Sequence, residues 1–306
     1  MRERLIDVVR RGVAIVGDGG MGTELQRAGL EPGGCGDERN VTHPDAVQAI
    51  HRRYVEAGSQ VLLTNTFGTN RFVLSRYGLE DRVTDIARAA AINARAAAGT
   101  RAWVLGDIGP CGGFLEPLGD ISEADLEATW RAVMGAMLEA GVDGIIVETM
   151  SAVDEMTLGV RVARALGAPL VVASMAYDAV RGGFKTMMGV SPADGVRSAI
   201  EAGADIVGAN CGRMEPEEFV QVAAAMRAVT DAPLMLQPNA GQPVLVGDAI
   251  VYPRDPESLA PALVELARHA AIVGGCCGTT PGHVGAFRAA IEGGGGLEPV
   301  RPAAPR

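Results

Sequence analysis

Lysine is nearly absent from this sequence. Among 306 residues the only lysine is Lys185, which is expected to lie in a glycine-rich loop rather than on a strand. A Schiff-base mechanism has no other candidate residue, so this chemistry is not expected. Histidine is also scarce, and its four positions are His43, His51, His269 and His283. None of them follows a predicted strand, and each is expected to be solvated or hydrogen-bonded on a helix, which argues against a histidine metal site.

Other absences restrict the class of protein. No apolar run approaches the roughly 18 residues that a membrane span needs, and the first residues carry no signal-peptide core. The net charge is −10 and the isoelectric point is near 5.0, which argues against a nucleic-acid partner. The cysteine count is five, and the spacing does not suggest a disulfide scaffold. The sequence therefore predicts a cytoplasmic protein with reduced thiols.

Short β-branched runs alternate with helical patterns along the whole chain. Most of the runs are apolar nearly throughout, as expected of parallel strands that are buried on both faces. The eight predicted strands are 13–17, 60–65, 102–107, 144–148, 170–174, 206–209, 234–237 and 271–275. Eight such strands, each followed by a helix, predict an α/β fold of the (β/α)8 barrel type.

Helix signals and the lack of any linker support a single domain. Ser122, Ser191 and Thr280 are predicted N-caps, the last two followed by proline. An open doubly wound sheet is the alternative, but no G-x-G-x-x-G follows the first strand. We expect residues 1–292 to form the barrel and the glycine- and proline-rich tail, 293–306, to be disordered.

Three cysteines follow predicted strands. Cys211 follows the sixth strand, and the adjacent Cys276 and Cys277 follow the eighth. Because the carboxyl ends of barrel strands meet at one face, the three thiols are compatible with one zinc ion that keeps a fourth position open. A redox disulfide between the adjacent pair is the alternative. Cys35 and Cys111 are interpreted as small buried hydrophobes.

Polar residues at the same face suggest a pocket for a zwitterion. Asp18 or Glu148 would accept from an ammonium group, and the glycine-rich loop 17–23 is expected to be a tight turn whose free N–H groups bind a carboxylate. A metal-bound sulfur site with one vacancy further suggests a substrate that carries a thiol. An amino-acid thiol has all of these groups.

These residues resemble the homocysteine S-methyltransferase family. The resemblance covers about residues 10 to 290, and the most specific segment is Gly274-Gly275-Cys276-Cys277-Gly278-Thr279-Thr280-Pro281. Less specific matching segments are Asp18 to Leu25, Thr64 to Gly68, Gly106 to Pro110, Glu148 to Met150, Gly208 to Cys211 and Pro238 to Gly241.

The resemblance implies a zinc-dependent enzyme that methylates homocysteine to methionine. It implies that Cys211, Cys276 and Cys277 bind zinc and that homocysteine's sulfur takes the open position. The homocysteine amino group would meet Glu148, and the carboxylate would meet the backbone around Asp18 and Gly19, with Thr66 nearby. Asn210 is also expected in the substrate site. By analogy with the family, a homo-oligomer is expected.

The methyl donor stays open at the level of sequence. A methyl group is transferred most readily from a cationic centre, so a small methyl-onium compound such as S-methylmethionine or betaine is expected. Aromatic residues, which hold quaternary ammonium groups, make up only 4% of the chain. The candidates near the upper loops are Phe67, Phe72, Tyr77, Phe114, Tyr177 and Phe184. Animal betaine enzymes of the family carry an aromatic residue where this chain has Thr149, which weakens the betaine interpretation.

Three alternatives stay open. The first is a barrel served by a separate methylcorrinoid protein, because the segment 114–120 is closer to the methionine-synthase type. The second is an acceptor that is another thiol or a selenol such as selenocysteine. The third is a zinc-binding scaffold that is active only within a complex.

Overall fold

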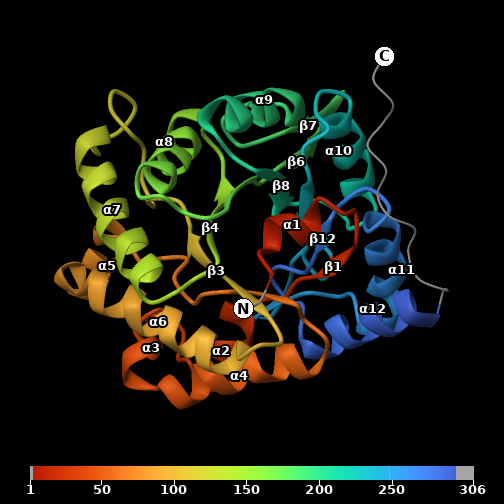
Figure 1. Cartoon of the computed structure of the whole chain (residues 1–306), viewed down its shortest axis with the longest axis horizontal. Helices are drawn as coiled ribbons and strands as arrows, with labels where there is room; N and C mark the ends of the chain where they lie inside the picture. The colour runs from red at the N-terminus through yellow and green to blue at the C-terminus, as the bar shows by residue number, and fades with distance from the viewer. Residues whose placement is uncertain (1–2, 248, 294–306) are drawn as a thin grey trace.

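The computed structural model describes residues 3–247 and 249–293 and shows a barrel of eight parallel strands surrounded by helices (Figure 1). The order around the barrel is β1-β12-β9-β8-β5-β4-β3-β2. These strands are β1 (Ile15–Val16), β2 (Val61–Leu63), β3 (Trp103–Ile108), β4 (Gly144–Met150), β5 (Val171–Met175), β8 (Ile206–Asn210), β9 (Leu234–Gln237) and β12 (Ile272–Val273). The predicted barrel is therefore confirmed, and each of the eight predicted ranges overlaps one of its strands.

Two of the predicted N-caps are confirmed. The Ser122 hydroxyl accepts from the Asp125 N–H at 3.1 Å, and Ser191 caps the helix that begins at Pro192 in the same way. The helices are α1 (Leu5–Val9), α2 (Met21–Arg27), α3 (Arg39–Thr42), α4 (Pro44–Glu56), α5 (Arg71–Leu74), α6 (Val83–Ala98), α7 (Glu123–Glu139), α8 (Val153–Ala165), α9 (Pro192–Ala202), α10 (Glu218–Arg227), α11 (Pro256–Leu266) and α12 (Pro281–Gly293), with 3-10 turns at Ser75–Tyr77 and Glu80–Arg82. In the described part of the chain, no helix has both the length and the apolar character needed to cross a membrane.

The seam between the first and second strands is closed largely by side chains. The Gln60 N–H donates to the Val16 carbonyl at 2.7 Å, and the Gln60 side chain accepts from the Val16 N–H at 3.2 Å. Two residues after Val16, the Asp18 carboxylate accepts from the Leu63 N–H at 2.8 Å. These bonds join the two ends of the sheet, so Asp18 has a structural role in closing the barrel.

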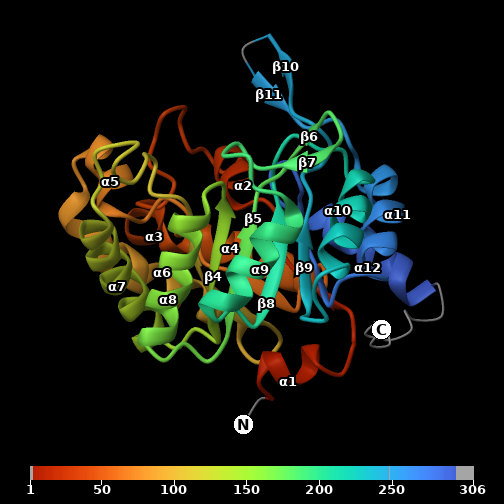
Figure 2. The ribbon, with the colours of Figure 1, turned by 90° about the horizontal axis from the view of Figure 1, so that it is seen from above.

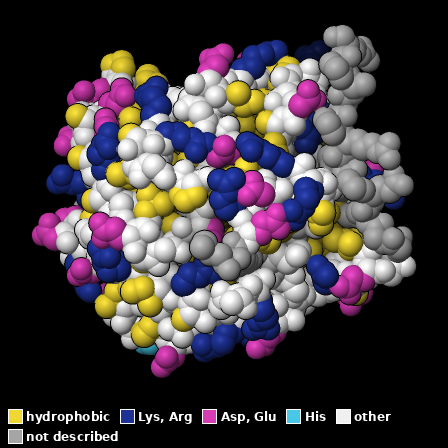
Figure 3. Space-filling model, in the orientation of Figure 1, with side chains coloured by type: hydrophobic (Ala, Val, Ile, Leu, Met, Phe, Trp, Pro, Cys, Tyr) yellow, Lys and Arg dark blue, Asp and Glu magenta, His cyan; other side chains and the backbone are white. Residues whose placement is uncertain are grey.

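Helix α1 covers one end of the barrel, and the site lies at the other (Figure 2). Leu5, Ile6 and Val9 of α1 pack on a buried apolar cluster that includes Leu105, Ile146 and other strand residues. On the face that α1 covers, acidic and basic side chains are interspersed (Figure 3). This end is sealed by apolar packing, which leaves the carboxyl ends of the strands as the open end.

Two hairpins at the open end were not predicted. They are β6 (Asp178–Val180) with β7 (Gly183–Lys185), and β10 (Val244–Val246) with β11 (Ala249–Val251). Both lie at the end of the barrel away from α1 (Figure 2). Lys185, expected in a loop, is therefore on a hairpin strand. The predicted disordered tail, 293–306, lies outside the described residues except for Gly293, which ends α12.

One histidine differs from the expectation. His51 lies on α4 but is fully buried, and neither of its ring nitrogens has a hydrogen-bond partner among the described residues. Burial lowers the pKa of His51 to about 4, so the ring is neutral near pH 7. His51 therefore contributes no charge to the core. It lies on a helix away from the strands that carry the cysteines, so it is not a ligand in their cluster.

Candidate active site

The barrel interior changes from apolar to polar toward the open end. Because side chains alternate along a strand, the residue two positions beyond each inward apolar residue also points inward. The inward apolar residues Leu105, Ile146 and Val172 are thus followed by Asp107, Glu148 and Ser174. Asn210 on β8 and Gln237 on β9 continue this polar layer, which is buried throughout. The layer forms the floor of the site.

The three predicted cysteine ligands are brought together at the edge of this floor. The Sγ atoms of Cys211, Cys276 and Cys277 all lie within 4.8 Å of one another, and those of Cys276 and Cys277 are 4.0 Å apart. Two thiolates about 2.3 Å from a tetrahedral zinc ion are about 3.8 Å apart. The donor set and the spacing therefore fit a zinc ion with three sulfur ligands, and the thiols are free rather than paired in disulfides.

Hydrogen bonding within the cluster makes one thiol acidic. Donation from Cys211 and Cys276 holds the pKa of Cys277 well below its usual range, although burial acts in the opposite direction. The pKa of Cys276 is raised well above its ordinary value by the same shared hydrogen bonds and by burial. Cys277 is thus a thiolate near pH 7, whereas Cys211 and Cys276 keep protons that a bound metal ion would displace.

The turn after β12 aims the cysteine pair through a series of backbone bonds. The Gly275 N–H donates to the Asp18 carbonyl at 2.8 Å, and the Cys276 N–H donates to the Pro238 carbonyl at 2.8 Å. The Cys277 N–H donates to the Asn239 side chain at 3.1 Å. A Cβ atom on Gly275 would lie 2.4 Å from the Thr279 hydroxyl oxygen, so only glycine fits this close approach.

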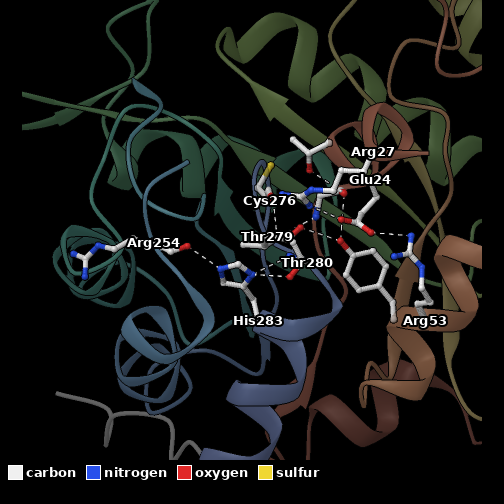
Figure 4. A network of polar contacts seen from close by, with 11 residues as sticks. Glu24, Arg27, Arg53, Arg254, Cys276, Thr279, Thr280 and His283 are labelled. Carbon is white, nitrogen blue, oxygen red and sulfur yellow. Dashed lines mark hydrogen bonds and ion pairs between the residues drawn. The ribbon is translucent and has the colours of Figure 1, made fainter. Parts of the chain in front are cut away.

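A polar network joins this turn to the start of α12 (Figure 4). The Thr279 hydroxyl donates to the Cys276 carbonyl at 2.6 Å and accepts from the Gly20 N–H at 3.0 Å. His283 accepts from the Thr280 N–H at Nδ1, 3.1 Å away, so Nε2 carries the proton and donates to the Arg254 carbonyl at 2.9 Å. On the other side of the network, Glu24 pairs with Arg53 at 2.8 Å. These bonds anchor the turn that carries two of the three thiols.

Buried carboxyl groups line the same cavity as the cysteines. Burial raises the pKa of Glu148 to about 8, with a further contribution from the nearby Asp18 charge. Burial likewise raises the pKa of Asp18 to about 7. The pKa of Asp107 is raised well above its ordinary value by burial and by Glu148, to which Asp107 is hydrogen-bonded. Asp107 Oδ1 has no hydrogen-bond partner among the described residues. A cation bound beside these groups would lower their pKa values and favour the ionised carboxylates.

These groups line one cavity of about 380 Å³. Of the predicted site residues, Asp18, Gly19, Thr66, Glu148 and the three cysteines line it. Asn210 does not line the cavity, because it is completely buried beneath the lining. The Thr66 hydroxyl donates to the Asp107 carbonyl at 2.7 Å. The expected tight turn 17–23 is only partly a loop, since Met21 begins α2.

Some lining residues were missed. Asp37 is fully buried in the cavity wall, and Cys35, interpreted above as a buried hydrophobe, is half-buried there. Tyr252 lies outside the cavity lining but packs directly on Gly278 of the cysteine turn, where an added Cβ would lie 2.2 Å from the ring. Neither Asp37 nor Tyr252 follows a barrel strand, so the strand-end rule could not find them. The long segment between β9 and α11 was the one available signal for an inserted element.

The aromatic candidates divide by position. Phe67 and Tyr77 line the cavity and are 46% and 44% exposed, so both rings are accessible. Tyr177 is buried, Phe72 and Phe184 pack against the core, and Phe114 is exposed outside the cavity lining. Only two of the six candidates therefore offer a face to a ligand in this cavity. Cys111, as expected, is buried away from the lining.

Comparisons with known proteins agree with this geometry. A model of the family described as homocysteine S-methyltransferase matches residues 15–291. The chain is 34% identical to a methionine synthase of Mycobacterium tuberculosis over 308 residues, covering 94% of this chain but 25% of that protein. It is 30% identical to betaine–homocysteine S-methyltransferase 1 of Danio rerio over 302 residues, covering 92% of this chain and 73% of that protein. The chain thus spans about a quarter of the methionine synthase.

A solved structure supports the fold. The metallated form of the homocysteine methyltransferase MmuM from Escherichia coli superposes with a TM-score of 0.75 and 22% sequence identity. The alignment covers 93% of this chain and 98% of that one.

Proposed function

This chain belongs to the homocysteine S-methyltransferase family, and we propose that it transfers a methyl group to the thiol of homocysteine, giving methionine, with zinc as its cofactor. The observation that carries the proposal is that three thiols, within 4.8 Å of one another, share one cavity with buried carboxyl groups. One substrate with both a thiol and an ammonium group would satisfy both sets of residues in that cavity.

Each part of the substrate has a complement in the chain. Cys211, Cys276 and Cys277 would hold the zinc ion, whose chemistry when bound is to favour the thiolate form of the substrate sulfur at neutral pH. Glu148 would accept from the substrate ammonium group, whose positive charge favours the ionised carboxylate. The backbone around Asp18 and Gly19, with Thr66, would receive the carboxylate.

The remaining cavity supports a small cationic donor. Phe67 and Tyr77 offer aromatic faces, and Asp37 offers a buried carboxylate, in the same cavity as the thiols. Aromatic faces and carboxylates attract sulfonium and quaternary ammonium groups. We therefore expect S-methylmethionine or a betaine-like compound as the donor. The methyl group leaves with neither electron of its bond to the donor, and the donor loses its positive charge as the sulfur–carbon bond forms.

A second candidate is transfer from a separate methylcorrinoid protein. The observation that favours it is the match to about a quarter of a methionine synthase, in which this barrel is one part of a longer chain. Methionine formed with a methylcorrinoid protein, and not with any small onium compound, would select this candidate.

The test is metal analysis combined with an activity assay. We expect about one zinc per chain and methionine formation from homocysteine and an onium donor. Cys211→Ser should lose most of the metal and at least about 100-fold in activity, because two thiolates hold zinc much more weakly. Cys111→Ser, a buried cysteine outside the cavity, is the matched control and should keep both. Methionine formation that is unchanged in metal-free Cys211→Ser protein would refute the proposal.

A second variant separates substrate binding from metal binding. Glu148→Gln should keep the zinc but raise the KM for homocysteine about 10- to 100-fold, because a charge-assisted hydrogen bond to the ammonium group is lost. Homocysteine analogues that lack the amino group should not distinguish this variant from the wild type. An equal rise in KM for homocysteine and for the analogues without the amino group would assign Glu148 another role.

A further inference from the structure

Strand β4 contains a β-bulge at the site. Val147 pairs with Ala173 of β5, but the next pair is Met150 with Met175. Glu148 and Thr149 therefore stand opposite the single residue Ser174. A bulge re-aims the side chains beside it. Here it directs both Glu148 and Thr149 toward the cavity, and it returns Met150 to the outer, helix-facing core that also contains Val147.

The bulge depends on an unfavourable backbone conformation. Thr149 has φ 59°, and Cys211 with φ 57° is the other non-glycine residue with positive φ in the described chain. A β-branched residue is rarely found in this region, because its Cβ substituents crowd the backbone. Something other than local preference must hold Thr149 in place.

The Asn210 side chain supplies that hold. Its Oδ1 accepts from the Thr149 N–H at 3.0 Å, and its Nδ2 donates to the Thr149 hydroxyl at 2.6 Å. The Ser174 hydroxyl also donates to Oδ1, at 2.6 Å. One buried amide therefore joins β8 to both strands of the bulge. Since Asn210 directly precedes Cys211, the same residue links the carboxylate strand to a thiol of the cluster.

We propose that Asn210 is a positioning residue, which holds Thr149 in its left-handed conformation and thereby sets Glu148 relative to the Cys211 sulfur. This inference rests on the proposed function, because Glu148 is taken as the group that receives the homocysteine ammonium. Asn210 acts through Thr149 and not by touching substrate: it lies beneath the cavity lining, and its Oδ1 already accepts two hydrogen bonds.

The test compares Asn210→Ala with a double variant that also carries Thr149→Gly. Asn210→Ala should raise the KM for homocysteine at least tenfold, because Thr149 then relaxes and turns Glu148 away. Glycine adopts positive φ without strain. Adding Thr149→Gly should therefore bring the KM back to within about threefold of that of Thr149→Gly alone. A purely structural role of Asn210 would give no such rescue.

Controls separate this result from general destabilisation. Arg227→Ala removes hydrogen bonds to the His269 carbonyl, outside the cavity, and should lower Tm without changing the KM for homocysteine. If Asn210→Ala does not fold, Thr149→Val tests the same hold, since it keeps the shape but removes the hydroxyl that Asn210 bonds. It should also raise the KM for homocysteine.

The outcomes are distinct. An unchanged KM in Asn210→Ala or, where that variant does not fold, in Thr149→Val, would overturn the positioning role and leave the proposed function standing. A KM for homocysteine in the double variant that is as high as in Asn210→Ala would also overturn the positioning role. A zinc-loaded wild type that neither binds nor methylates homocysteine would instead overturn the proposed function, and the positioning role with it.

Discussion

At the scale of single residues, Asp37 shows the cost of burying charge in this cavity. Its carboxylate accepts from the Thr69 hydroxyl at 2.8 Å, yet burial raises its pKa from the ordinary 3.8 to about 6. Below about pH 3 the group is protonated in both the folded and the unfolded chain. Between the two pKa values the folded state binds the extra proton, so stability due to Asp37 is lost as pH rises through 6.

Asp37→Asn should therefore gain stability relative to the wild type as pH rises. The shift of roughly two pKa units corresponds to a change of about 3 kcal/mol in the stability difference between about pH 3 and pH 8. Urea unfolding of both proteins across this range measures it, with the exposed Asp120→Asn as the control. A difference that is constant with pH would contradict the assigned pKa.

How far single residues could be predicted depended on their position relative to strands. Cys211, Cys276, Glu148 and Asp107 all follow or end buried strands, and the barrel brings such positions together. Asp37 reaches the cavity, and Tyr252 reaches the turn after Cys277, from long connections whose path is set by tertiary packing. The αL conformation of Thr149 contradicts the preference of its residue type, so no local signal could have indicated it.

At the scale of elements, the connection after β8 is fitted most tightly. Gly212 has φ 73°, and a Cβ there would lie 2.1 Å from the Tyr177 carbonyl oxygen, a backbone atom that cannot rotate away. Its own carbonyl accepts from the Asn239 side chain at 3.0 Å. This connection therefore fixes Cys211 against the segments that follow β5 and β9, the strands on either side of β8 in the barrel.

Gly212→Ala should destabilise the protein by roughly 4 kcal/mol or more and reduce zinc content, because strain and collision act together. Gly189→Ala is the matched control: its φ is 84°, but no atom lies within 4 Å of the added Cβ. Only the backbone strain of about 1–2 kcal/mol applies there. Denaturant unfolding measures the loss in the free energy of unfolding for both variants. Equal losses would show that the structure relieves the collision at residue 212 and would contradict the prediction.

The elements themselves were predictable where periodicity and caps agreed. Strand β9, Leu234–Gln237, was predicted at its observed boundaries, and Ser122 and Ser191 begin their helices as expected. The two antiparallel hairpins were missed, because short exposed strands of three residues carry no core periodicity. Strand β1 is only two residues long, because the seam beside it is bonded by the side chains of Gln60 and Asp18.

At the scale of the whole molecule, the proposed zinc ion would join distant parts of the chain. Its ligands come from the ends of β8 and β12, on either side of β9 in the barrel. A ligand that binds only the folded state stabilises it by mass action, about 2.7 kcal/mol at 100 times its Kd. Metal removal should therefore loosen the barrel as a unit.

Chelation should lower the Tm of the zinc-loaded protein by about 5 °C or more. Cys211→Ser, which lacks one ligand, should show little change on chelation, and Cys111→Ser should behave like the wild type. Differential scanning calorimetry with and without a chelator measures all three. If the wild-type protein is shown to have lost its metal and its Tm is unchanged, a structural contribution of the site is contradicted.

The measurement that tests the central claim most directly is X-ray absorption at the zinc edge, before and after homocysteine is added. The account predicts three sulfur ligands from the protein at about 2.3 Å, and a fourth sulfur at the same distance once homocysteine binds. A sulfur count that stays at three with homocysteine present at saturation would contradict it, because the substrate thiol would then react without reaching the metal.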